Sequence, residues 1–173
     1  GGSRTPRNLP ILLNWVKDEP LNIRIWLHLG NQYFADQKWL EAARWYTKFW
    51  MYNQNGLVGT PTDRWICMTY AARAWRELGD TKHAIQADMA AIAEFPEWAD
   101  GYIGMAENML QIGARTKDSL YFNRALHWGE LAIKMKPADR IAFINPLDYT
   151  FRLWQVMNVA YASVGRVQHA IEA

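Results

Sequence analysis

The fold of this chain is decided by residues 23–46, which read IRIWLHLGNQYFADQKWLEAARWY. If Trp26 is numbered as the fourth residue of a unit of about 34 residues, apolar side chains fall at regular positions. Positions 4, 7, 8, 11, 20 and 24 are then Trp26, Leu29, Gly30, Tyr33, Ala42 and Tyr46. This alternation of large and small residues predicts two antiparallel helices in close contact. Such a unit cannot bury its apolar face alone, so it must stack on neighbouring units.

The same pattern recurs three more times along the chain. We predict four units, near residues 23–56, 65–98, 99–139 and 151–173. Alanine occupies position 20 of every unit, as Ala42, Ala84, Ala125 and Ala170. In the second unit Gly79-Asp80 predicts the turn between helices, and Pro96 closes the unit at position 32. The pattern resembles the tetratricopeptide repeat, which implies an all-α α-solenoid of helix-turn-helix repeats. The alternative is a generic helical bundle whose periodicity arises by chance.

Three segments interrupt the repeat pattern, and each is predicted to be an inserted loop. Residues 53–63 are polar and rich in poor helix formers, with Thr62 or Asp63 expected to cap the next helix. About seven extra residues between 113 and 122 predict an expanded turn inside the third unit. Residues 140–150, before the fourth unit, are expected to be extended or turn-like.

Before the first unit, the sequence predicts one short helix. Its apolar face is formed by Leu9, Leu12, Leu13 and Val16. Pro20 is expected to end this helix. Gly1-Gly2-Ser3 resembles a remnant of cloning, so we expect a single domain over residues 4–173. Because the fourth unit stops at Ala173, we expect the chain to be cut from a longer protein or its last helix to be short.

Composition excludes several classes of protein. Half of the residues are apolar and 21% are charged, which argues against a disordered chain. No apolar run reaches the roughly 18 residues of a membrane helix, so no membrane span is expected. A net charge of +2 is too small to indicate a nucleic-acid partner. The single cysteine, Cys67, excludes an internal disulfide and fits a reducing, cytoplasmic compartment.

The sequence contains no recognisable catalytic or metal-binding pattern, and we expect no cofactor. The four histidines lie far apart and form no metal-ligand spacing. Cys67 falls in a predicted helix without an identified base, which favours a packing role over a nucleophilic one. Gly101-x-x-Gly104 lacks the Lys-Ser/Thr pair of a phosphate-binding loop. We therefore predict that this chain alone is not an enzyme.

The best candidate for a binding site is the surface formed by the first helix of each unit. In tetratricopeptide repeats, positions 2, 5, 9 and 12 of this helix line a concave groove that binds peptides. The resemblance therefore implies a partner-binding set of Arg24, Asn31, Phe34, Thr69, Arg73, Arg76, Glu107, Arg152 and Gln155. Arginine and amide side chains can bind a peptide backbone or acidic side chains. A full carboxylate clamp is not expected, because Leu27 replaces the lysine of chaperone-binding members. The alternative is a solvated groove wall with no partner.

A more specific resemblance covers the whole chain. The stretch Arg7-Asn8-Leu9-Pro10-Ile11-Leu12-Leu13, then Glu19-Pro20 and Asn22-Ile23-Arg24, is similar to the segment after the catalytic domain of family 2 glycosyltransferases with tetratricopeptide tails. Residues 63–84 and 146–150 also resemble those tails. The resemblance implies a non-catalytic C-terminal tail that holds an acceptor protein, orients the catalytic domain or mediates self-association. The catalytic Asp-x-Asp motif of that family is absent from this sequence, so no catalytic residue carries over.

Three functions stay open at this point. The first is a protein-binding module of a glycosyltransferase, whose partner is a protein or peptide that accepts the sugar. The second is a general scaffold or self-association module, a homo-oligomer unrelated to sugar transfer, with Trp50, Trp98 and Trp128 as contact residues. The third is direct carbohydrate binding, which ranks last because most aromatic residues fall at predicted core positions.

Overall fold

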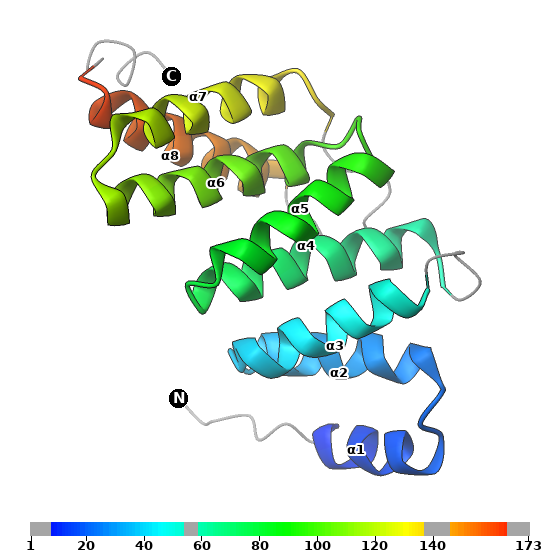
Figure 1. Cartoon of the computed structure of the whole chain (residues 1–173). Helices are drawn as coiled ribbons and strands as arrows, with labels where there is room; N and C mark the ends of the chain where they lie inside the picture. Colours follow the sequence, from blue (N-terminus) through cyan, green and yellow to red (C-terminus); the bar gives the residue numbers. More distant parts are fainter. Residues whose placement is uncertain (1–7, 54–58, 137–145, 166–173) are drawn as a thin grey trace. The chain divides into compact units, whose positions relative to one another are not determined.

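The computed structural model describes residues 8–53, 59–136 and 146–165, and every regular element in this part of the chain is an α-helix. The helices are α1 (Leu9–Asp18), α2 (Ile23–Ala35), α3 (Trp39–Tyr52), α4 (Pro61–Glu77), α5 (Thr81–Glu94), α6 (Ala99–Thr116), α7 (Ser119–Ile133) and α8 (Pro146–Ser163) (Figure 1). The chain divides into two compact units, Gly1–Asp80 and Thr81–Ala173. The predicted all-α architecture is confirmed for the described residues.

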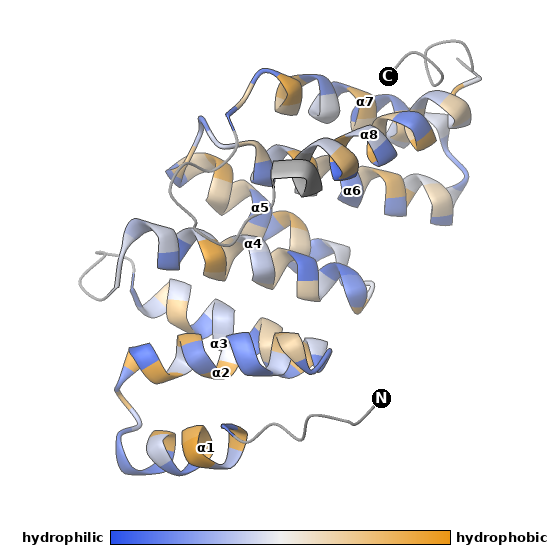
Figure 2. Ribbon diagram, turned by 180° about the vertical axis from the view of Figure 1, so that it is seen from behind, coloured by the Kyte–Doolittle hydropathy of each residue, from blue (hydrophilic) through white to orange (hydrophobic). Residues whose placement is uncertain are grey.

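The first unit is built from α1 to α4. Helices α2 and α3 are the two predicted helices of the first repeat, and α3 packs in turn on α4. The short N-terminal helix α1 lies against α2, where Leu12 packs with Ile25 and Leu29. Polar and apolar residues share each of these helices (Figure 2), as expected when one face is buried and the other is wet.

The packing of α2 on α3 depends on a glycine that faces a tyrosine. Tyr46 is only 1% exposed, and its ring lies directly over Gly30. A Cβ atom at Gly30 would come within 2.6 Å of a ring carbon, so no larger residue fits without a shift. The hydroxyl of Tyr46 donates a hydrogen bond to Oδ1 of Asn31 at 2.8 Å. The large–small contact that the sequence places at positions 24 and 8 is therefore present.

Helix α4 begins earlier than the sequence predicts. Its N-cap is Thr60, and neither Thr62 nor Asp63 takes that role. The Thr60 hydroxyl accepts from the backbone N–H of Asp63 at 3.3 Å, and the Asp63 carboxylate accepts from the backbone N–H of Thr60 at 2.7 Å. This capping box is followed by Pro61, whose missing N–H costs nothing in a first turn. The end of the predicted loop is thus helical, while residues 54–58 lie outside the described part.

The turn after α4 agrees with the prediction. Gly79 adopts a left-handed conformation with φ of +74°, which ends the helix, and α5 begins two residues later. The boundary between the two units falls at this turn, inside the second predicted repeat. The single domain expected over residues 4–173 stays a prediction. Gly1-Gly2-Ser3 and Ala170 lie outside the described residues.

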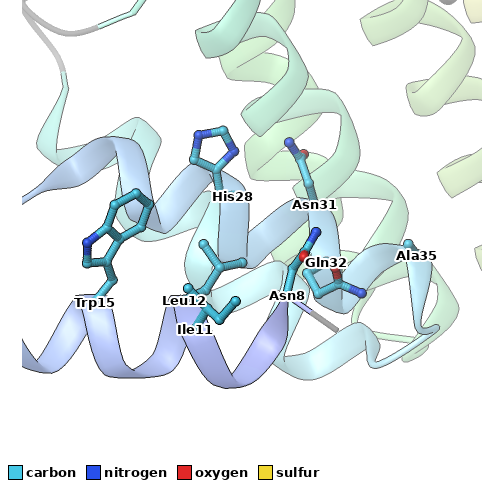
Figure 3. A pocket seen from close by; sticks show the side chains of 8 residues that line it. All are labelled: Asn8, Ile11, Leu12, Trp15, His28, Asn31, Gln32 and Ala35. Atoms are coloured by element: carbon cyan, nitrogen blue, oxygen red, sulfur yellow. The ribbon is translucent and has the colours of Figure 1, made fainter. Parts of the chain in front are cut away.

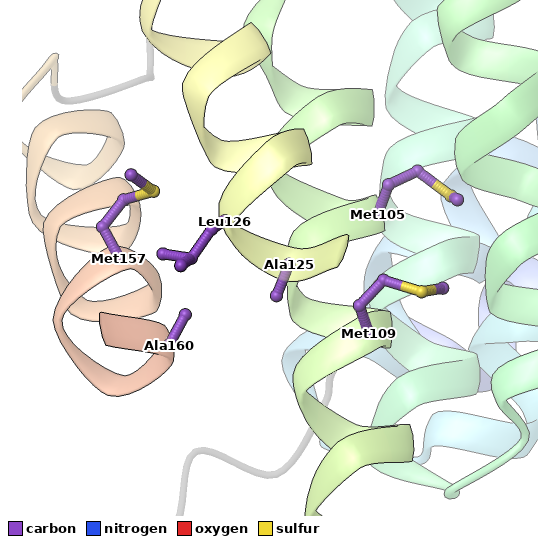
Figure 4. Close-up of a cluster of buried hydrophobic side chains, with 6 residues drawn as sticks. All are labelled: Met105, Met109, Ala125, Leu126, Met157 and Ala160. Carbon is purple, nitrogen blue, oxygen red and sulfur yellow. The ribbon is translucent and has the colours of Figure 1, made fainter. Parts of the chain in front are cut away.

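The second unit contains α5 to α8. Helix α6 packs on α5 and α7, and α8 packs on both α6 and α7. Its core is a cluster of methionine, alanine and leucine side chains from α6, α7 and α8 (Figure 4): Met105, Met109, Ala125, Leu126, Met157 and Ala160. Gly129 on α7 lies against the sulfur of Met157, and a Cβ there would overlap it. Close approach at a glycine therefore recurs in this unit.

The expanded turn predicted between residues 113 and 122 is wrong. Helix α6 continues to Thr116 and α7 begins at Ser119, so the extra residues lengthen two helices. Lys117 ends α6 in a left-handed conformation with φ of +59°. The side chain of Asp118 then accepts from the backbone N–H of Leu120 at 2.9 Å and caps α7. Two residues with the right local chemistry complete this turn.

The prediction for residues 140–150 is also wrong where it can be compared. Helix α8 begins at Pro146, so residues 146–150 are helical instead of extended. Proline suits this place because its fixed φ matches a helix and its missing N–H is not needed in the first turn. Residues 140–145 lie outside the described part. Among the described helices, none combines the length and the apolar character needed to cross a membrane.

Gly30→Ala should test the helix contact. Helix propensity alone would stabilise the alanine variant by about 1 kcal/mol. We expect instead a net loss of about 1–3 kcal/mol in the free energy of unfolding, because the added methyl group presses on the buried Tyr46 ring. Urea unfolding followed by circular dichroism measures the difference. The loss should shrink in a Tyr46→Leu background, and a stabilised Gly30→Ala protein would contradict the packing described here.

The buried thiol of Cys67 and phenol of Tyr46 should make the fold sensitive to alkali. Burial raises the pKa of Cys67 well above its ordinary 9.0, and burial raises the pKa of Tyr46 above its ordinary 10.0. Both contributions to stability are complete below pH 9 and are lost as pH rises, because the unfolded chain ionises first.

The free energy of unfolding should therefore fall between pH 9 and 10.5 and fall less in Cys67→Ala and Tyr46→Phe proteins. Native Cys67 should also resist a thiol reagent at neutral pH, since it is fully buried. If the free energy of unfolding fell with pH as steeply in both variants as in the unmodified protein, neither Cys67 nor Tyr46 would be the cause of the alkaline destabilisation.

Candidate functional site

The residues predicted to bind a partner fall into two sets, one in each unit. Within the first unit, α2 and α4 contact each other and carry Arg24, Asn31, Phe34, Thr69, Arg73 and Arg76. Within the second unit, α6 and α8 contact each other and carry Glu107, Arg152 and Gln155. The first helices of successive repeats thus lie side by side in each unit, as the repeat pattern requires. The two sets differ in what their side chains do.

In the first unit, Phe34 is the centre of an aromatic cluster. Its ring makes edge contacts with Tyr70, Trp39 and Tyr46, at centroid distances of 4.8, 5.2 and 6.2 Å. Such edge-to-face arrangements are the favoured geometry for aromatic pairs. Phe34, Trp39 and Tyr70 are only partly buried, so the cluster reaches the surface. Sequence reasoning missed Trp39 and Tyr70, because neither occupies a groove position of the repeat.

Arg73 lies over this aromatic cluster. The carbon of its guanidinium is 5.5 Å from the centroid of the Phe34 ring, within the range of a cation–π contact. The residue is exposed, and among the described residues no carboxylate pairs with it. The ring face holds the planar group in place while its N–H donors remain open to solvent. Arg73 therefore combines a fixed position with an unsatisfied charge.

The other predicted residues of this unit differ in availability. Asn31 is exposed and uses Oδ1 to accept from Tyr46, which leaves its amide N–H groups to donate. Arg24 is exposed at the start of α2. The Thr69 hydroxyl donates to the backbone carbonyl of Trp65 at 2.9 Å, so it is engaged within its own helix. Arg76 is 7% exposed and does not lie on the open surface.

In the second unit, Glu107 and Arg152 bind each other. Arg152 donates from Nε to Oε1 of Glu107 at 3.1 Å, and from Nη2 to Oε1 and Oε2 at 2.9 and 3.0 Å. Asp100 lies 3.9 Å from Nη1 of the same arginine. Burial lowers the pKa of Arg152, but the carboxylates of Glu107 and Asp100 outweigh it and raise that pKa. Glu107 and Arg152 thus bind each other, a pairing that the sequence did not predict.

A buried polar pair lies close to this ion pair. Nδ2 of Asn108 donates to Oδ2 of Asp88 at 2.8 Å, and both side chains are almost fully buried. Gly104 makes room for the Asp88 carboxylate, which a Cβ at that position would overlap. Asp88 stands at position 24, where the first repeat has Tyr46. A carboxylate in place of an aromatic residue at this position was visible in the sequence and could have indicated a buried polar contact.

The tryptophans proposed for self-association are partly buried. Trp98 stacks on Phe95 with a centroid distance of 4.7 Å. Trp128 packs against the core that includes Tyr102. Trp50 is half-buried on α3. The most exposed large apolar side chains of the described helices lie elsewhere, among them Ile11, Trp15, Ile133, Phe151 and Trp154.

Comparison with known proteins identifies the fold. No family model matches this sequence, and no curated protein matches it. Two crystal structures of MamA resemble the chain with TM-scores of 0.68 and 0.69, at 20% and 21% sequence identity. Each covers 94% of this chain, which in turn covers 75% and 80% of the MamA chains.

A crystal structure of BtubC (BKLC) from P. vanneervenii is also similar. Its TM-score is 0.59 at 18% identity, over 87% of this chain and 59% of that one. At such low sequence identities, the structural similarity shows a shared fold and says nothing about function. The described part of this chain therefore has an all-α, tetratricopeptide-like solenoid fold, as the sequence predicted.

Breaking the Glu107–Arg152 pair should destabilise the second unit. We expect Glu107→Ala to cost about 1–2 kcal/mol in the free energy of unfolding, because it leaves a partly buried guanidinium without its two-point partner. A double-mutant cycle with Arg152→Ala, measured by urea unfolding, isolates the coupling energy. Glu130→Ala on the exposed side of α7 is the control. A coupling energy near zero would mean that solvent screens the pair.

Proposed function

We propose that this chain is a protein-interaction module whose first unit binds an extended acidic peptide. The observation that carries the proposal is the exposed guanidinium of Arg73 held over the Phe34 ring. We define the peptide surface as Arg24, Asn31, Phe34, Tyr70 and Arg73. It offers charge, amide donors and ring edges on two helices that contact each other.

The chemistry of this surface favours a carboxylate next to an apolar side chain. A guanidinium presents N–H donors in a planar fork that matches the two oxygens of a carboxylate. Because Phe34 already restricts Arg73, less side-chain entropy is lost when a ligand binds. The partly buried rings of Phe34 and Tyr70 can accept an apolar side chain beside the carboxylate.

The amide of Asn31 supports an extended backbone in the ligand. Its oxygen is held by Tyr46, so the orientation of the side chain is set by the fold. An N–H donor fixed in this way suits the carbonyl groups of a peptide that lies along the helices. The second unit offers less to an acidic ligand, because Glu107 already neutralises Arg152.

The finer proposal follows from the resemblance to glycosyltransferase tails. In this proposal the bound protein is an acceptor of sugar transfer, and the chain works in the cytoplasm, where its free Cys67 stays reduced. This link rests on the sequence motifs alone. A full-length protein without an upstream sugar-transferase domain would overturn it and leave the peptide proposal intact.

An array of immobilised peptides tests the binding proposal. The peptides pair Asp or Glu with an aromatic or aliphatic residue at varied spacing, and matched peptides carry Asn or Gln instead. We expect the acidic peptides to bind, and Arg73→Glu to weaken the binding at least about tenfold by fluorescence anisotropy, since a charge pair is replaced by repulsion. Arg73→Lys should lose part of the affinity.

Arg44→Glu on α3 serves as the control, because Arg44 is exposed and lies outside the peptide surface. It changes the net charge by the same amount as Arg73→Glu. Equal losses in the two variants would indicate a general charge effect and contradict a specific site. Failure of every acidic peptide to bind would contradict the proposal itself.

A further inference from the structure

One lysine of the first unit lies against two tryptophan rings. Nζ of Lys48 on α3 is 4.0 Å from the ring centroid of Trp26 on α2 and 5.1 Å from that of Trp45 on α3. Both distances are within the range of a cation–π contact. Lys48 is exposed, and among the described residues no carboxylate pairs with its ammonium group. Two aromatic rings, and no acidic side chain of the described part, thus hold this charge.

The two rings form a fixed frame around the ammonium group. Trp26 is only 1% exposed, and Tyr52 makes an edge contact with it at a centroid distance of 5.3 Å. Trp45 packs against the core of α1 and α2 that includes Leu29. Nε1 of Trp26 is buried and has no hydrogen-bond partner among the described residues, so packing holds this ring in place. Because the frame is already rigid, little entropy is lost when a cation binds to it.

The third repeat shows that such a pair of rings packs without a cation. Its positions 4 and 23, which correspond to the two tryptophans, are Tyr102 and Trp128, with ring centroids 6.1 Å apart. Position 26, where the first repeat has Lys48, is Leu131, and this leucine packs against the same core. The charge of Lys48 is therefore a feature of the first repeat and not a requirement of the helix packing.

The two rings lie apart from the other candidate surfaces of the first unit. On α2, a groove with α1 is lined by His28, Asn31 and Gln32 (Figure 3). Neither this groove nor the peptide surface shares a residue with Trp26, Trp45 or Lys48. A cation bound between the rings is therefore a second binding activity, which does not rest on the proposed function.

We propose that Trp26 and Trp45 form a binding site for a trimethylated lysine side chain of a partner protein, and that Lys48 occupies this site when the partner is absent. The rings already hold a cation at the end of a four-carbon stem, which is the shape of that ligand. A trimethylammonium group keeps the positive charge but has no N–H groups to hydrate, so it leaves water more readily than a primary ammonium group. The displaced Lys48 regains hydrogen bonds with water, which favours the exchange.

Nuclear magnetic resonance of the ¹⁵N-labelled chain tests the proposal. The probe is a short capped peptide with one trimethyl-lysine, and the indole N–H signals of Trp26 and Trp45 report the contact. Both signals should shift in a saturable way. A peptide with the neutral isostere, in which carbon replaces the charged nitrogen, should bind at least about fivefold more weakly, because it keeps the shape and loses the charge.

Two substitutions of Lys48 separate occupancy of the site from charge. Lys48→Ala empties the site and should strengthen binding about two- to fivefold, the factor by which an exposed cation–π contact holds the lysine in place. Lys48→Leu removes the same charge but supplies the side chain that the third repeat has at this position, so it should weaken binding. Both proteins should keep the helical circular dichroism of the unmodified chain, since Lys48 is exposed. Arg73→Glu should lose binding of acidic peptides and retain binding of trimethyl-lysine.

Other results overturn the proposal. Equal binding of the neutral isostere would show an apolar contact without a role for charge. Equal affinity of the Lys48→Ala, Lys48→Leu and unmodified proteins would place the ligand elsewhere. The lack of a saturable shift in all three proteins would show that the rings hold only the chain's own lysine. Binding to phosphatidylcholine vesicles without binding to the peptide would assign the site to a lipid headgroup instead of a protein.

Discussion

The structure depends on how closely two helices can approach where a small residue faces a large one. Tyr46 lies over Gly30 with no space for a Cβ, and Met157 lies over Gly129 in the same way. These contacts set the spacing of each helix pair, and the spacing decides which side chains reach the surface. The aromatic cluster around Phe34 exists because α2, α3 and α4 are held at this distance.

The repeat pattern predicted the helices well and their ends poorly. Positions 4, 8, 20 and 24 identify faces that must be buried, so α2 and α3 followed from spacing, and the turn at Gly79 followed from the Gly79-Asp80 pair. The pattern predicts loops for the extra residues, yet these residues lengthen α4, α6, α7 and α8. Adding residues to an existing helix requires no new nucleus, and a turn needs only a pair such as Lys117-Asp118 to reverse the chain. The ends of the helices are therefore set by capping residues, which the repeat pattern does not include.

For the candidate site, the sequence located the residues but not their partners. Glu107 and Arg152 are separated by 45 residues, and nothing in the spacing of single helices pairs them. Thr69 bonds to its own helix, and Arg76 is buried, although both hold groove positions. The contact of Arg73 with Phe34 depends on the distance between two helices of neighbouring repeats. Such pairings emerge from tertiary packing, which a one-dimensional pattern does not contain.

The pairing of Asp88 with Asn108 makes two neighbouring repeats specific for each other. Asp88 belongs to the second predicted repeat. Its partner Asn108 belongs to the third, as does Gly104, which makes room for the Asp88 carboxylate. An aromatic residue at 88, as the first repeat has at 46, would remove the carboxylate that accepts from Nδ2 of the buried Asn108. Repeats of one family are often regarded as interchangeable modules. In this chain the order of the repeats is instead encoded in a buried polar contact, so duplication or shuffling of single repeats is restricted at this junction.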